Sequence, residues 1–574
     1  MSRGSTPDDQ RRPTQVDALV VGSGLGGLSS AAYLAACGLR TIVLEQGKVA
    51  GGCSQVFRRQ GNRYEFDVGV HYIGECDPGG RMTMLLHGLG LDERVSFREL
   101  DPDGYATIVL PGLTFRVPRG WDNYLNRLVE VFPDEERGLR RCVRMMKYVA
   151  ERMPAGPLPS SPRAALAALR GMPAVPIGLM SVQRLLDICG LSPQARAVLL
   201  GESGDYGTPP SRAPVAVHAG VLHHYLRGGA YYPSGGGQVI AANLVECIEA
   251  LGGQVRTKAK VEQILVEAGA AVGVRLAGGE ELRAPVVISN ADYRRTLLEL
   301  VGRDHLRRGT VRKVERARMA LPFFSAYLGL DIDLSERLPN STFWIYPNAD
   351  VEGHYQAAYS GRVPDGPPVF FTSATTKDPD NRRAAPPGHS TLELMCLAPA
   401  DHTFWAVTGD PASAGPGHPP NVAYEDRKEA LVELLIDRAT SVIPDLREHI
   451  VWKEASTPVT QERFTLSTGG ACYGLELARD QVGPKRPGVR TEIRGLYLTG
   501  ASTIWGHGIV GVMLGGLGTA STVLGRDLTS EVLAGRQIAA PLLDQPVPDD
   551  WDPLLVCRTS SPIRQRRSSP GLAS

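Results

Sequence analysis

Two apolar segments and the glycine-rich turn between them constrain the fold of this chain more than any other feature. Residues Asp17 to Val21 form an apolar stretch typical of a short buried strand. Small and apolar residues from Leu25 to about Cys37 predict a helix. Gly22, Gly24 and Gly27 at the junction match the spacing G-x-G-x-x-G. The order strand, glycine turn, helix predicts the start of a parallel α/β sheet.

Each part of this unit has a physical role in holding a dinucleotide. Gly22 allows the tight turn, Gly24 lets the backbone approach a pyrophosphate, and Gly27 lets the helix pack closely on the strand. The free N–H groups and positive dipole end of the helix attract the anion. A second apolar stretch, residues 41–44, leads into Glu45, which can accept hydrogen bonds from both ribose hydroxyls and disfavours a 2′-phosphate. The unit therefore predicts nucleotide binding.

Composition narrows the functional class. A chain of 574 residues is long enough for more than one lobe, and a formal net charge of +1 argues against general nucleic-acid binding. Nine scattered cysteines without a C-x-x-C pair predict reduced thiols, no zinc site and a cytoplasmic location. The polar start is not a secretory signal, and no run of about 18 apolar residues predicts a transmembrane helix. Peripheral membrane contact stays open.

Two later blocks complete the nucleotide-binding lobe. Residues 231–238 precede an amphipathic helix, and strand-like segments with glycine turns follow between 255 and 289. Near the end, the apolar stretch before Gly500 is followed by a glycine-rich turn and a small-residue helix after Gly508. A single G-x-G-x-x-G with such a late strand–glycine–helix unit predicts one extended cofactor that runs from the first helix to the last. FAD has that shape.

The same features divide the chain into segments. We expect a flexible tail (1–15), three parts of an FAD-binding domain (16–110, 230–292, 490–533), a substrate- or membrane-facing region (111–229), a substrate domain (293–489) and a Pro-rich, basic, disordered end (534–574).

Further stretches carry a resemblance to a known family. They are Glu65–Gly74, Asp205–Pro210, His218–Gly229, Tyr232–Gly236, Val287–Asp292, Lys377–Pro379, Pro387–Thr391 and Leu496–Gly500. Together with the glycine motifs, they resemble the FAD-dependent phytoene desaturase and carotene isomerase superfamily and, within it, the retinol saturase branch. The resemblance covers about residues 16–525. One departure is the segment 504–507, Ile-Trp-Gly-His, where desaturases often carry a Gly-rich stretch with a Pro.

The resemblance implies a fold, a cofactor and a site. The fold class is α/β: a Rossmann-like FAD-binding domain built from discontinuous segments, with an α+β substrate-binding domain of the flavin amine oxidase and phytoene desaturase type. The residues implied to bind FAD are Gly22, Ser23, Gly24, Gly26, Gly27, Glu45, Gly51, Gly52, Val261, Gly500, Gly508, Ile509 and Val510. The helix that starts at Gly508 would direct its N–H groups at the flavin and stabilise its anionic reduced form.

Flavin carries the hydride, so the protein has to supply at most a proton. His71, Tyr72 and His507 are the candidates for catalysis, because an imidazole or phenol near the flavin can give or take one proton. Glu202 is predicted to be a residue of a turn rather than a catalytic acid. Adjacent His223 and His224 face different directions on a helix, so we expect no metal.

The sequence predicts an FAD-dependent oxidoreductase that saturates, desaturates or isomerises a long apolar isoprenoid. Its substrate is then a hydrophobic small molecule, and its electron donor or acceptor is not identified. A flavin amine oxidase-like enzyme and a non-redox lipid-binding protein of the GDP-dissociation-inhibitor type are the alternatives.

Overall fold

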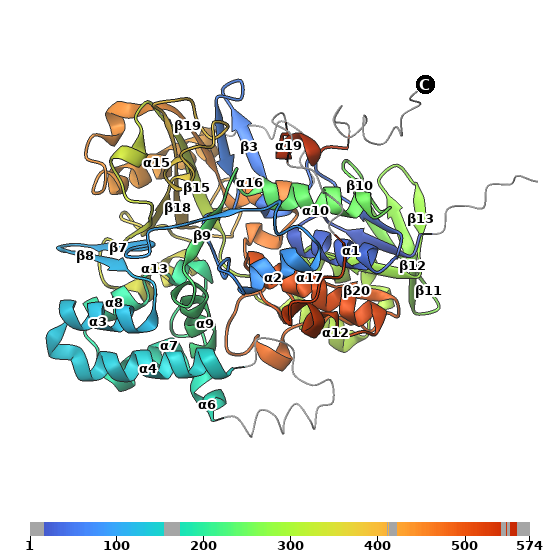
Figure 1. Ribbon diagram of the computed structural model, residues 1–574, viewed down its shortest axis with the longest axis horizontal. Helices are drawn as coiled ribbons and strands as arrows, with labels where there is room; N and C mark the ends of the chain where they lie inside the picture. The colour runs from blue at the N-terminus through green and yellow to red at the C-terminus, as the bar shows by residue number, and fades with distance from the viewer. Residues whose placement is uncertain are drawn as a thin grey trace, which may run out of the picture.

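A five-stranded parallel sheet forms the centre of one half of the molecule (Figure 1). The computed structural model describes residues 16–153, 173–409, 411, 422–540, 547 and 551–559. The order of the sheet is β10 (Gln254–Arg256), β2 (Thr41–Leu44), β1 (Ala18–Val21), β14 (Val286–Ser289) and β20 (Leu496–Leu498). Each neighbouring pair is parallel. The predicted α/β fold is confirmed, and strands from three distant parts of the chain build its sheet.

Both faces of β1 are covered, which is why its sequence is continuously apolar. Ala18 and Val20 pack into the core shared with α1 (Leu25–Ala36), α10 (Gln238–Ala250) and α17 (Ile509–Leu524). Leu19 and Val21 pack on the opposite side. That side holds the antiparallel layer β11 (Val261–Glu267), β12 (Ala270–Leu276) and β13 (Glu281–Arg283).

A seven-stranded sheet forms the second domain. Its order is β19 (Ile450–Ser456), β15 (Phe323–Leu330), β18 (Ser390–Leu397), β17 (Val369–Thr372), β16 (Thr342–Ile345), β7 (Ala106–Leu110) and β8 (Leu113–Val117). Only the pair β16–β7 is parallel in this sheet as described. Alternate residues such as Phe324 and Leu394 pack toward α15 (Val422–Ala439), whereas their neighbours Phe323 and Met395 face a cavity.

Helices and short strands surround the two sheets. The helices beside the second sheet are α3 (Trp121–Val131), α4 (Glu136–Arg152), α6 (Ala174–Gly178), α7 (Val182–Cys189), α8 (Pro193–Leu199) and α9 (Val215–Leu226). Two small sheets are β3 (Val56–Arg59) with β4 (Tyr64–Asp67), and β5 (Ile73–Gly74) with β9 (Ala230–Pro233) and β6 (Phe97–Glu99). The other helices are α2 (Arg81–Gly88), α11 (Tyr293–Arg295), α12 (Arg308–Arg316), α13 (Val351–Tyr359), α14 (Ala374–Lys377), α16 (Pro458–Thr465), α18 (Leu528–Leu533) and α19 (Pro553–Val556).

Two expected boundaries differ from the structure. The first expected FAD-binding segment ended at residue 110, but β7 pairs with β8 and β16 and so belongs to the second sheet. The end of the chain was expected to be disordered from residue 534, yet residues 551–559 are placed and contain α19. Asp552 accepts hydrogen bonds from both terminal nitrogens of Arg58 at 2.7 and 2.8 Å. This pair and the burial of Cys557 hold the segment against the body of the molecule. The expected tails 1–15 and 560–574 lie outside the described residues.

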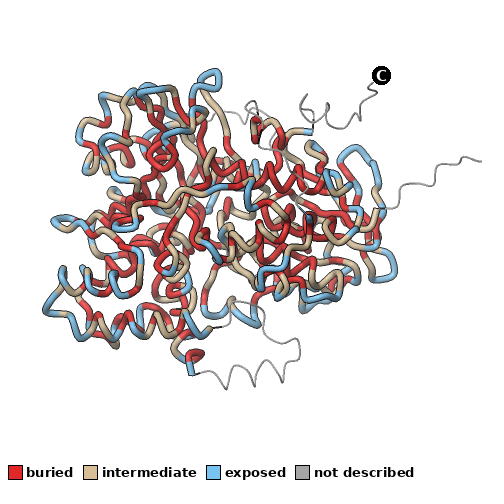
Figure 2. The backbone as a smooth tube through the Cα atoms, viewed as in Figure 1, coloured by how far each residue is buried: buried red, intermediate tan, exposed pale blue. Residues whose placement is uncertain are grey.

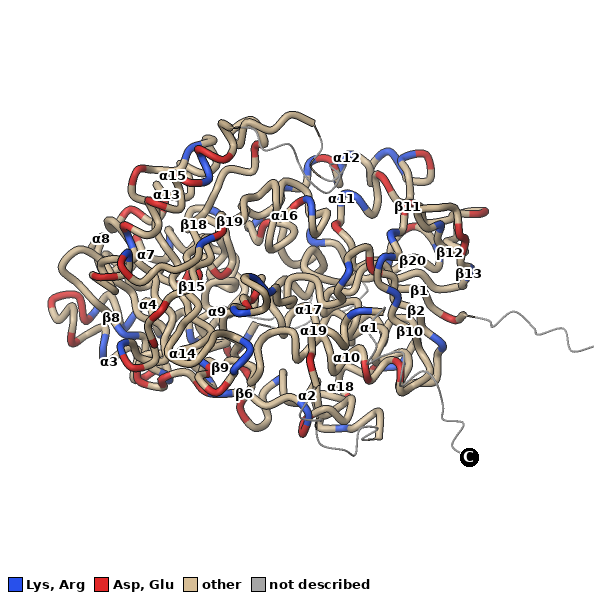
Figure 3. The backbone as a smooth tube through the Cα atoms, turned by 90° about the horizontal axis from the view of Figure 1, so that it is seen from above, with Lys and Arg blue, Asp and Glu red and all other residues tan. Residues whose placement is uncertain are grey.

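Burial and charge separate the interior from the surface. Buried backbone runs through both sheets and the helices between them, and exposed backbone is concentrated in peripheral turns (Figure 2). Lysines and arginines alternate with acidic residues around the outline of the molecule, α12 and α15 included (Figure 3). Within the described residues, no helix combines the length and the apolar character that a bilayer crossing requires.

Candidate functional site

The turn from β1 into α1 has the geometry that its glycines predicted. Gly22 has a φ of +90°, which a residue with a side chain rarely adopts. A Cβ on Gly27 would lie 2.2 Å from the carbonyl oxygen of Gly22, so only glycine allows this approach of helix and strand. Leu28 donates the first helical hydrogen bond, to Gly24 at 3.0 Å. The N–H groups that precede Leu28 in the first turn have no acceptor within the helix, so they can bind an anion.

Glu45 is fixed beside this turn. Its carboxylate accepts hydrogen bonds from the backbone N–H of Ser23 at 3.0 Å, from the Ser23 hydroxyl at 2.6 Å and from the N–H of Gly47 at 2.7 Å. The side chain is buried and follows directly after β2. A carboxylate held at this place can accept hydrogen bonds from a ribose diol, as the sequence predicted.

Gly51 and Gly52 lie against the same turn. Gly51 forms a bridge to Gly24 and donates its N–H to the Ser23 carbonyl at 3.1 Å. A Cβ on Gly52 would lie 2.8 Å from the Cα of Gly24. Val261, at the start of β11, packs in the same core cluster as Leu44 and so lies toward the Glu45 end of the sheet.

The late glycine segment meets the first one. Gly500 follows β20 with a φ of +87°, and a Cβ on Gly26 would lie 3.1 Å from the Gly500 Cα. Gly508, with a φ of +80°, caps the N-terminus of α17, and no acidic side chain occupies the first turn at Ile509 and Val510. The predicted cofactor residues from both ends of the chain therefore lie side by side.

Buried polar atoms along these segments fit a long polar ligand. Ser54 Oγ, Thr499 Oγ1 and His507 Nε2 are buried and have no hydrogen-bond partner among the described residues. They lie next to the Gly51–Gly52 turn, before Gly500 and before α17. With the uncapped helix starts, the glycine cradle and Glu45, they suit the pyrophosphate, ribose and flavin of FAD.

Two of the predicted catalytic residues, His71 and Tyr72, lie between β4 and β5. His71 Nε2 lies 3.1 Å from Glu393 Oε2, and its ring meets Phe370 edge-on at 5.2 Å between centroids. The Tyr72 hydroxyl donates to Asp205 Oδ2 at 2.6 Å. Both residues face the second sheet.

His507 lies on the other side of the site. Its ring stacks on Tyr473 with 4.3 Å between centroids. Burial lowers the pKa of His507 to about 3, and the positive charge of Arg486 adds to this effect. The imidazole is therefore neutral at physiological pH, where it can donate or accept a hydrogen bond but holds no exchangeable excess proton.

Lys377 was recognised only as part of a family motif, yet it belongs to the site. Its ammonium donates to the His71 carbonyl oxygen and to Thr372 Oγ1, each at 2.6 Å. Burial lowers the pKa of Lys377 to about 8, against the opposing effect of Asp67 and Glu393. These groups line a cavity of about 240 Å³. The sequence signal was a lysine at the end of the short segment that follows the apolar strand β17.

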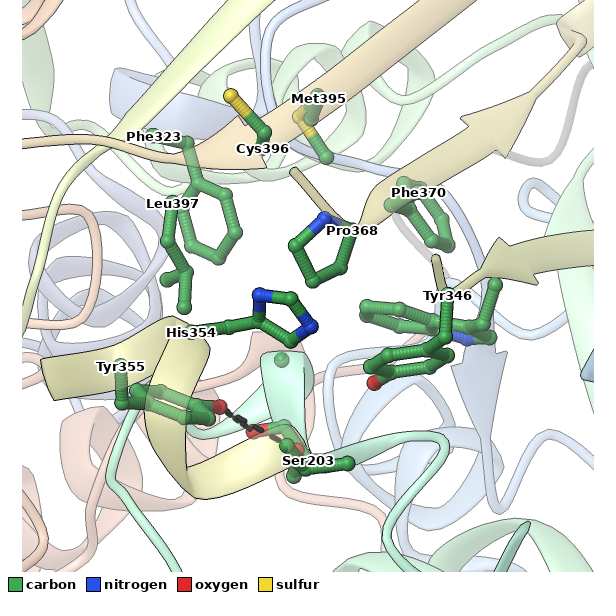
Figure 4. Close-up of a pocket in the computed structure, with 13 residues that line it drawn as sticks. Ser203, Phe323, Tyr346, His354, Tyr355, Pro368, Phe370, Met395, Cys396 and Leu397 are labelled. Carbon is green, nitrogen blue, oxygen red and sulfur yellow. Dashed lines mark hydrogen bonds between the residues drawn. The ribbon is translucent and has the colours of Figure 1, made fainter. Parts of the chain in front are cut away.

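A larger cavity of about 370 Å³ opens between β15, β16, β17, β18 and α13 (Figure 4). Its walls are aromatic and aliphatic: Phe323, Trp344, Tyr346, Val351, Tyr355, Pro368, Phe370, Met395 and Leu397, with Ser203, Gly204, His354 and Cys396. The ring of His354 points among Pro368, Tyr346 and Leu397. The hydrophobic periodicity of the sequence could not locate this cavity, because both faces of its strands are apolar.

The histidines on α9 have structural partners. His224 Nε2 accepts the N–H of Gly74 at 2.9 Å, so Nδ1 carries the hydrogen that faces Glu75 Oε1 at 2.8 Å. His218 Nδ1 lies 3.2 Å from the Tyr206 hydroxyl, and burial lowers its pKa to about 4. Across the described residues, no three His, Cys, Asp or Glu side chains are grouped as metal ligands.

Glu202 does lie in a turn, as predicted, but the turn is in the interior. Both Glu202 and Asp205 are inaccessible enough that burial raises their pKa, to about 8 and about 6. Sequence reasoning did not foresee this pair as titratable groups in the site. The available signal was two acids three positions apart between apolar helices.

Comparisons with known proteins agree with this geometry. Residues 25–296 match the family described as flavin containing amine oxidoreductase. The chain is 30% identical to all-trans-retinol 13,14-reductase of Homo sapiens over 554 residues, which cover 91% of this chain and 87% of that protein. It is 28% identical to the chloroplastic prolycopene isomerase 2 of an Oncidium hybrid cultivar over 558 residues, 94% of this chain and 88% of that one.

Solved structures show the same fold. An oxidoreductase from Methanosarcina mazei superposes with a TM-score of 0.60 at 18% identity, covering 89% of this chain and all of that chain. A putrescine oxidase superposes with a TM-score of 0.57 at 15% identity, covering 89% and 99%. The chain is thus an FAD-dependent oxidoreductase and belongs to the flavoenzyme family that contains the all-trans-retinol 13,14-reductases and the prolycopene isomerases.

Proposed function

We propose that this enzyme acts on a carbon–carbon double bond of a long apolar isoprenoid of the retinoid or carotenoid type. The observation that carries the proposal is a continuous aromatic wall between the large cavity and the cofactor segment. Phe323 lines the cavity and meets Tyr473 edge-on at 5.8 Å, and Tyr473 stacks on His507 just before α17. A polyene bound along this wall would have one end at the flavin.

The chemistry divides between cofactor and chain. FAD, when bound, supplies the hydride exchange. We propose that Gly22, Ser23, Gly24, Gly26, Gly27, Glu45, Gly51, Gly52, Val261, Gly500, Gly508, Ile509 and Val510 hold it. His71 and Tyr72 then orient the substrate and exchange a proton with it, and neutral His507 positions the flavin or the substrate through a hydrogen bond.

The cavity favours an apolar substrate over an amine. No carboxylate is among the described residues that line it, so a protonated amine would find no counter-charge there. The names of the two relatives, a retinol reductase and a prolycopene isomerase, support a substrate of this class.

The test is anaerobic turnover. Purified enzyme would be reduced with dithionite and mixed separately with all-trans-retinol, a cis-carotenoid and putrescine, and the products would be separated by chromatography and mass. We expect addition of two hydrogens to the retinoid or a cis-to-trans change in the carotenoid. Phe370→Ala should weaken apolar substrate binding, whereas Phe464→Ala, 70% exposed, should not. Oxidation of putrescine alone would contradict the proposal.

We also propose peripheral contact with a membrane, where such substrates reside. Arg137, Arg141 and Arg144 are exposed along α4, and Leu179, 43% exposed, follows the adjoining α6. Basic residues beside an apolar one suit an anionic lipid surface. Sedimentation with anionic vesicles should fall when Arg137, Arg141 and Arg144 become Glu. Equal binding by the wild type to neutral and anionic vesicles would contradict an electrostatic contact.

A further inference from the structure

A buried glutamic acid, Glu202, and a half-buried aspartic acid, Asp205, share one short turn beside the large cavity. The turn Ser203–Asp205 follows α8, and the N–H of Asp205 bonds to the carbonyl oxygen of Glu202 at 3.1 Å. In a 3₁₀ turn, residues three apart lie on the same side, so both acids face the same surroundings.

The turn is clamped onto the cavity wall. The Tyr346 hydroxyl donates to the Gly201 carbonyl at 2.8 Å, and the Tyr355 hydroxyl donates to the Ser203 carbonyl at 2.9 Å. A Cβ on Gly204 would lie 2.4 Å from the ring of Trp344. Since Tyr346, Tyr355 and Trp344 all line the cavity, the acids lie directly behind its wall.

Tyr72 connects the acids with the cavity. Its hydroxyl donates a hydrogen bond to Asp205, and hydrogen bonding by Tyr72 also lowers the pKa of Glu202 against the effect of burial. Its ring stacks with Phe370, a wall residue, at 6.3 Å between centroids and lies tilted to Tyr225 at 4.6 Å. The phenol ring therefore packs against the cavity wall at Phe370, while its hydroxyl faces the groups able to hold a proton.

The surroundings of the acids favour a bound proton. The Tyr105 hydroxyl donates to Glu202 Oε2 at 3.1 Å, while Oε1 is buried without a partner among the described residues. Desolvation is the largest cause of the raised pKa of each acid, and the negative charge of Asp205 raises the pKa of Glu202 further. The titratable groups that act on the pair are His71, Tyr72, Tyr105, Tyr124, Tyr206, His224, Tyr225, Tyr346, Tyr355 and Tyr473.

We propose that Glu202 and Asp205 hold a shared proton in reserve and that Tyr72 delivers it to the substrate carbon when a double bond is saturated. This inference rests on the proposed function. One olefinic carbon takes the hydride that reduced FAD supplies, and the π electrons of the double bond form a bond from the adjacent carbon to the Tyr72 proton. The acid pair returns a proton to Tyr72, one carboxylate is left ionised, and water reprotonates it before the next turnover. Tyr72 is the catalytic residue, and the acids act through it.

The first test compares Glu202→Gln, Asp205→Asn and Tyr72→Phe in single turnover of the dithionite-reduced holoenzyme with all-trans-retinol. Loss of a general acid should slow saturation by about 100-fold or more with flavin absorption unchanged, and Glu202→Gln and Asp205→Asn should also leave retinol binding unchanged. In the wild type, the rate should fall as pH rises past about 8, the pKa of Glu202, and Glu202→Gln should abolish that fall.

The second test does not depend on turnover. Infrared spectra of the full chain at neutral pH should contain the carbonyl stretch of a protonated carboxyl that Glu202→Gln removes. Glu246 is a buried carboxylate that pairs with Arg94 at 2.6 Å. Glu246→Gln is therefore the matched control and should leave that band in place. A wild type without the band would overturn the inference.

The outcomes separate this inference from the function on which it rests. If the wild type saturates retinol and Glu202→Gln does so at the same rate and with the same pH profile, the proton reserve is wrong and the function stands. If the wild type converts neither retinoid nor carotenoid, the proposed function and the delivery step both fail. The infrared band would then still decide whether the pair holds a proton.

Discussion

At the scale of single residues, the buried carboxyl groups of Glu45 and Glu202 differ in the hydrogen-bond donors that surround them. Glu45 accepts three hydrogen bonds, two of them from backbone N–H groups, so both of its buried oxygens have donors. Glu202 accepts one from a tyrosine, and no cation pairs with it among the described contacts. Burial therefore favours the neutral form of Glu202 and leaves Glu45 suited to binding polar hydroxyls.

Glu202→Gln should flatten part of the pH dependence of stability. The pKa of Glu202 rises from 4.5 to about 8 on folding, so the folded state binds more protons than the unfolded state in that interval. The contribution of Glu202 to the free energy of unfolding is then fully present below about pH 4.5. It is lost as pH rises through about 8, with a slope approaching about 1.4 kcal/mol per pH unit. His218 and His507 act in the opposite direction at lower pH, so the wild-type minus variant difference isolates Glu202.

Urea unfolding of both proteins across this pH range measures that difference. Glu280→Gln is the control, because Glu280 is exposed and Arg256 lowers its pKa rather than raising it. The control should reproduce the wild-type curve between about pH 5 and pH 8. A wild-type minus Glu202→Gln difference that does not change with pH would contradict the raised pKa.

Gly27→Ala should disrupt the cofactor turn. The new methyl group would meet the Gly22 carbonyl oxygen, a backbone atom that cannot rotate away, and overpacking of this kind costs about 1–3 kcal/mol. The measurement is bound FAD per protein by absorbance, with the unfolding midpoint. Gly220→Ala is the matched helical control, because a methyl group there meets no atom within 4 Å. Retained FAD in Gly27→Ala would contradict the close approach as a requirement.

At the scale of elements, the sequence predicted what depends on neighbours along the chain. β1, α1 and β2 followed from a motif within about thirty residues, and α17 followed from its small residues. The Tyr72–Asp205 contact joins residues 133 positions apart, so only tertiary packing reveals it. α19 was missed for a related reason: its four apolar residues follow a Pro- and Asp-rich stretch, and only the contact of Asp552 with Arg58 shows that they are held against the body of the molecule.

The contact between α1 and α17 should depend on Gly516. A Cβ there would lie 2.6 Å from the Gly26 carbonyl oxygen and from the Ser29 Cβ, so the two helices would have to separate. Gly516→Ala should lower the unfolding free energy by about 1–3 kcal/mol and release FAD, since both helices start at the residues that we propose hold the cofactor. Thermal unfolding and FAD fluorescence measure the two effects.

Gly309→Ala in α12 is the control for this change. A methyl group there meets no atom within 4 Å, and Ala is the better helix former, so stability should rise by about 0.5–1 kcal/mol. If both variants behave alike, the close approach of α1 and α17 does not limit stability.

At the scale of the whole molecule, the cofactor domain is assembled from distant segments. β1 and β2 come from the first fifty residues, β10 and β14 from the middle, and β20 from the end. The second sheet likewise takes β7 and β8 from an early segment and its other strands from residues 323–456. A ligand that touches Gly24, Gly51 and Gly500 at once would join the first and the last of the cofactor segments, and contact with Val261 would add the middle one.

FAD should therefore stabilise the full chain against unfolding. Binding to the folded state alone adds about 2.7 kcal/mol at a free concentration of 100 times Kd, and the unfolding midpoint rises with concentration. FAD would be removed by a high-salt, low-pH wash, and thermal unfolding followed with increasing added FAD. Glu45→Gln weakens the contact with the ribose hydroxyls, so its midpoint should need more FAD for the same rise. Identical midpoints with and without FAD would contradict this role, because a ligand held by Ser23, Glu45 and Gly500 cannot bind the unfolded chain equally well.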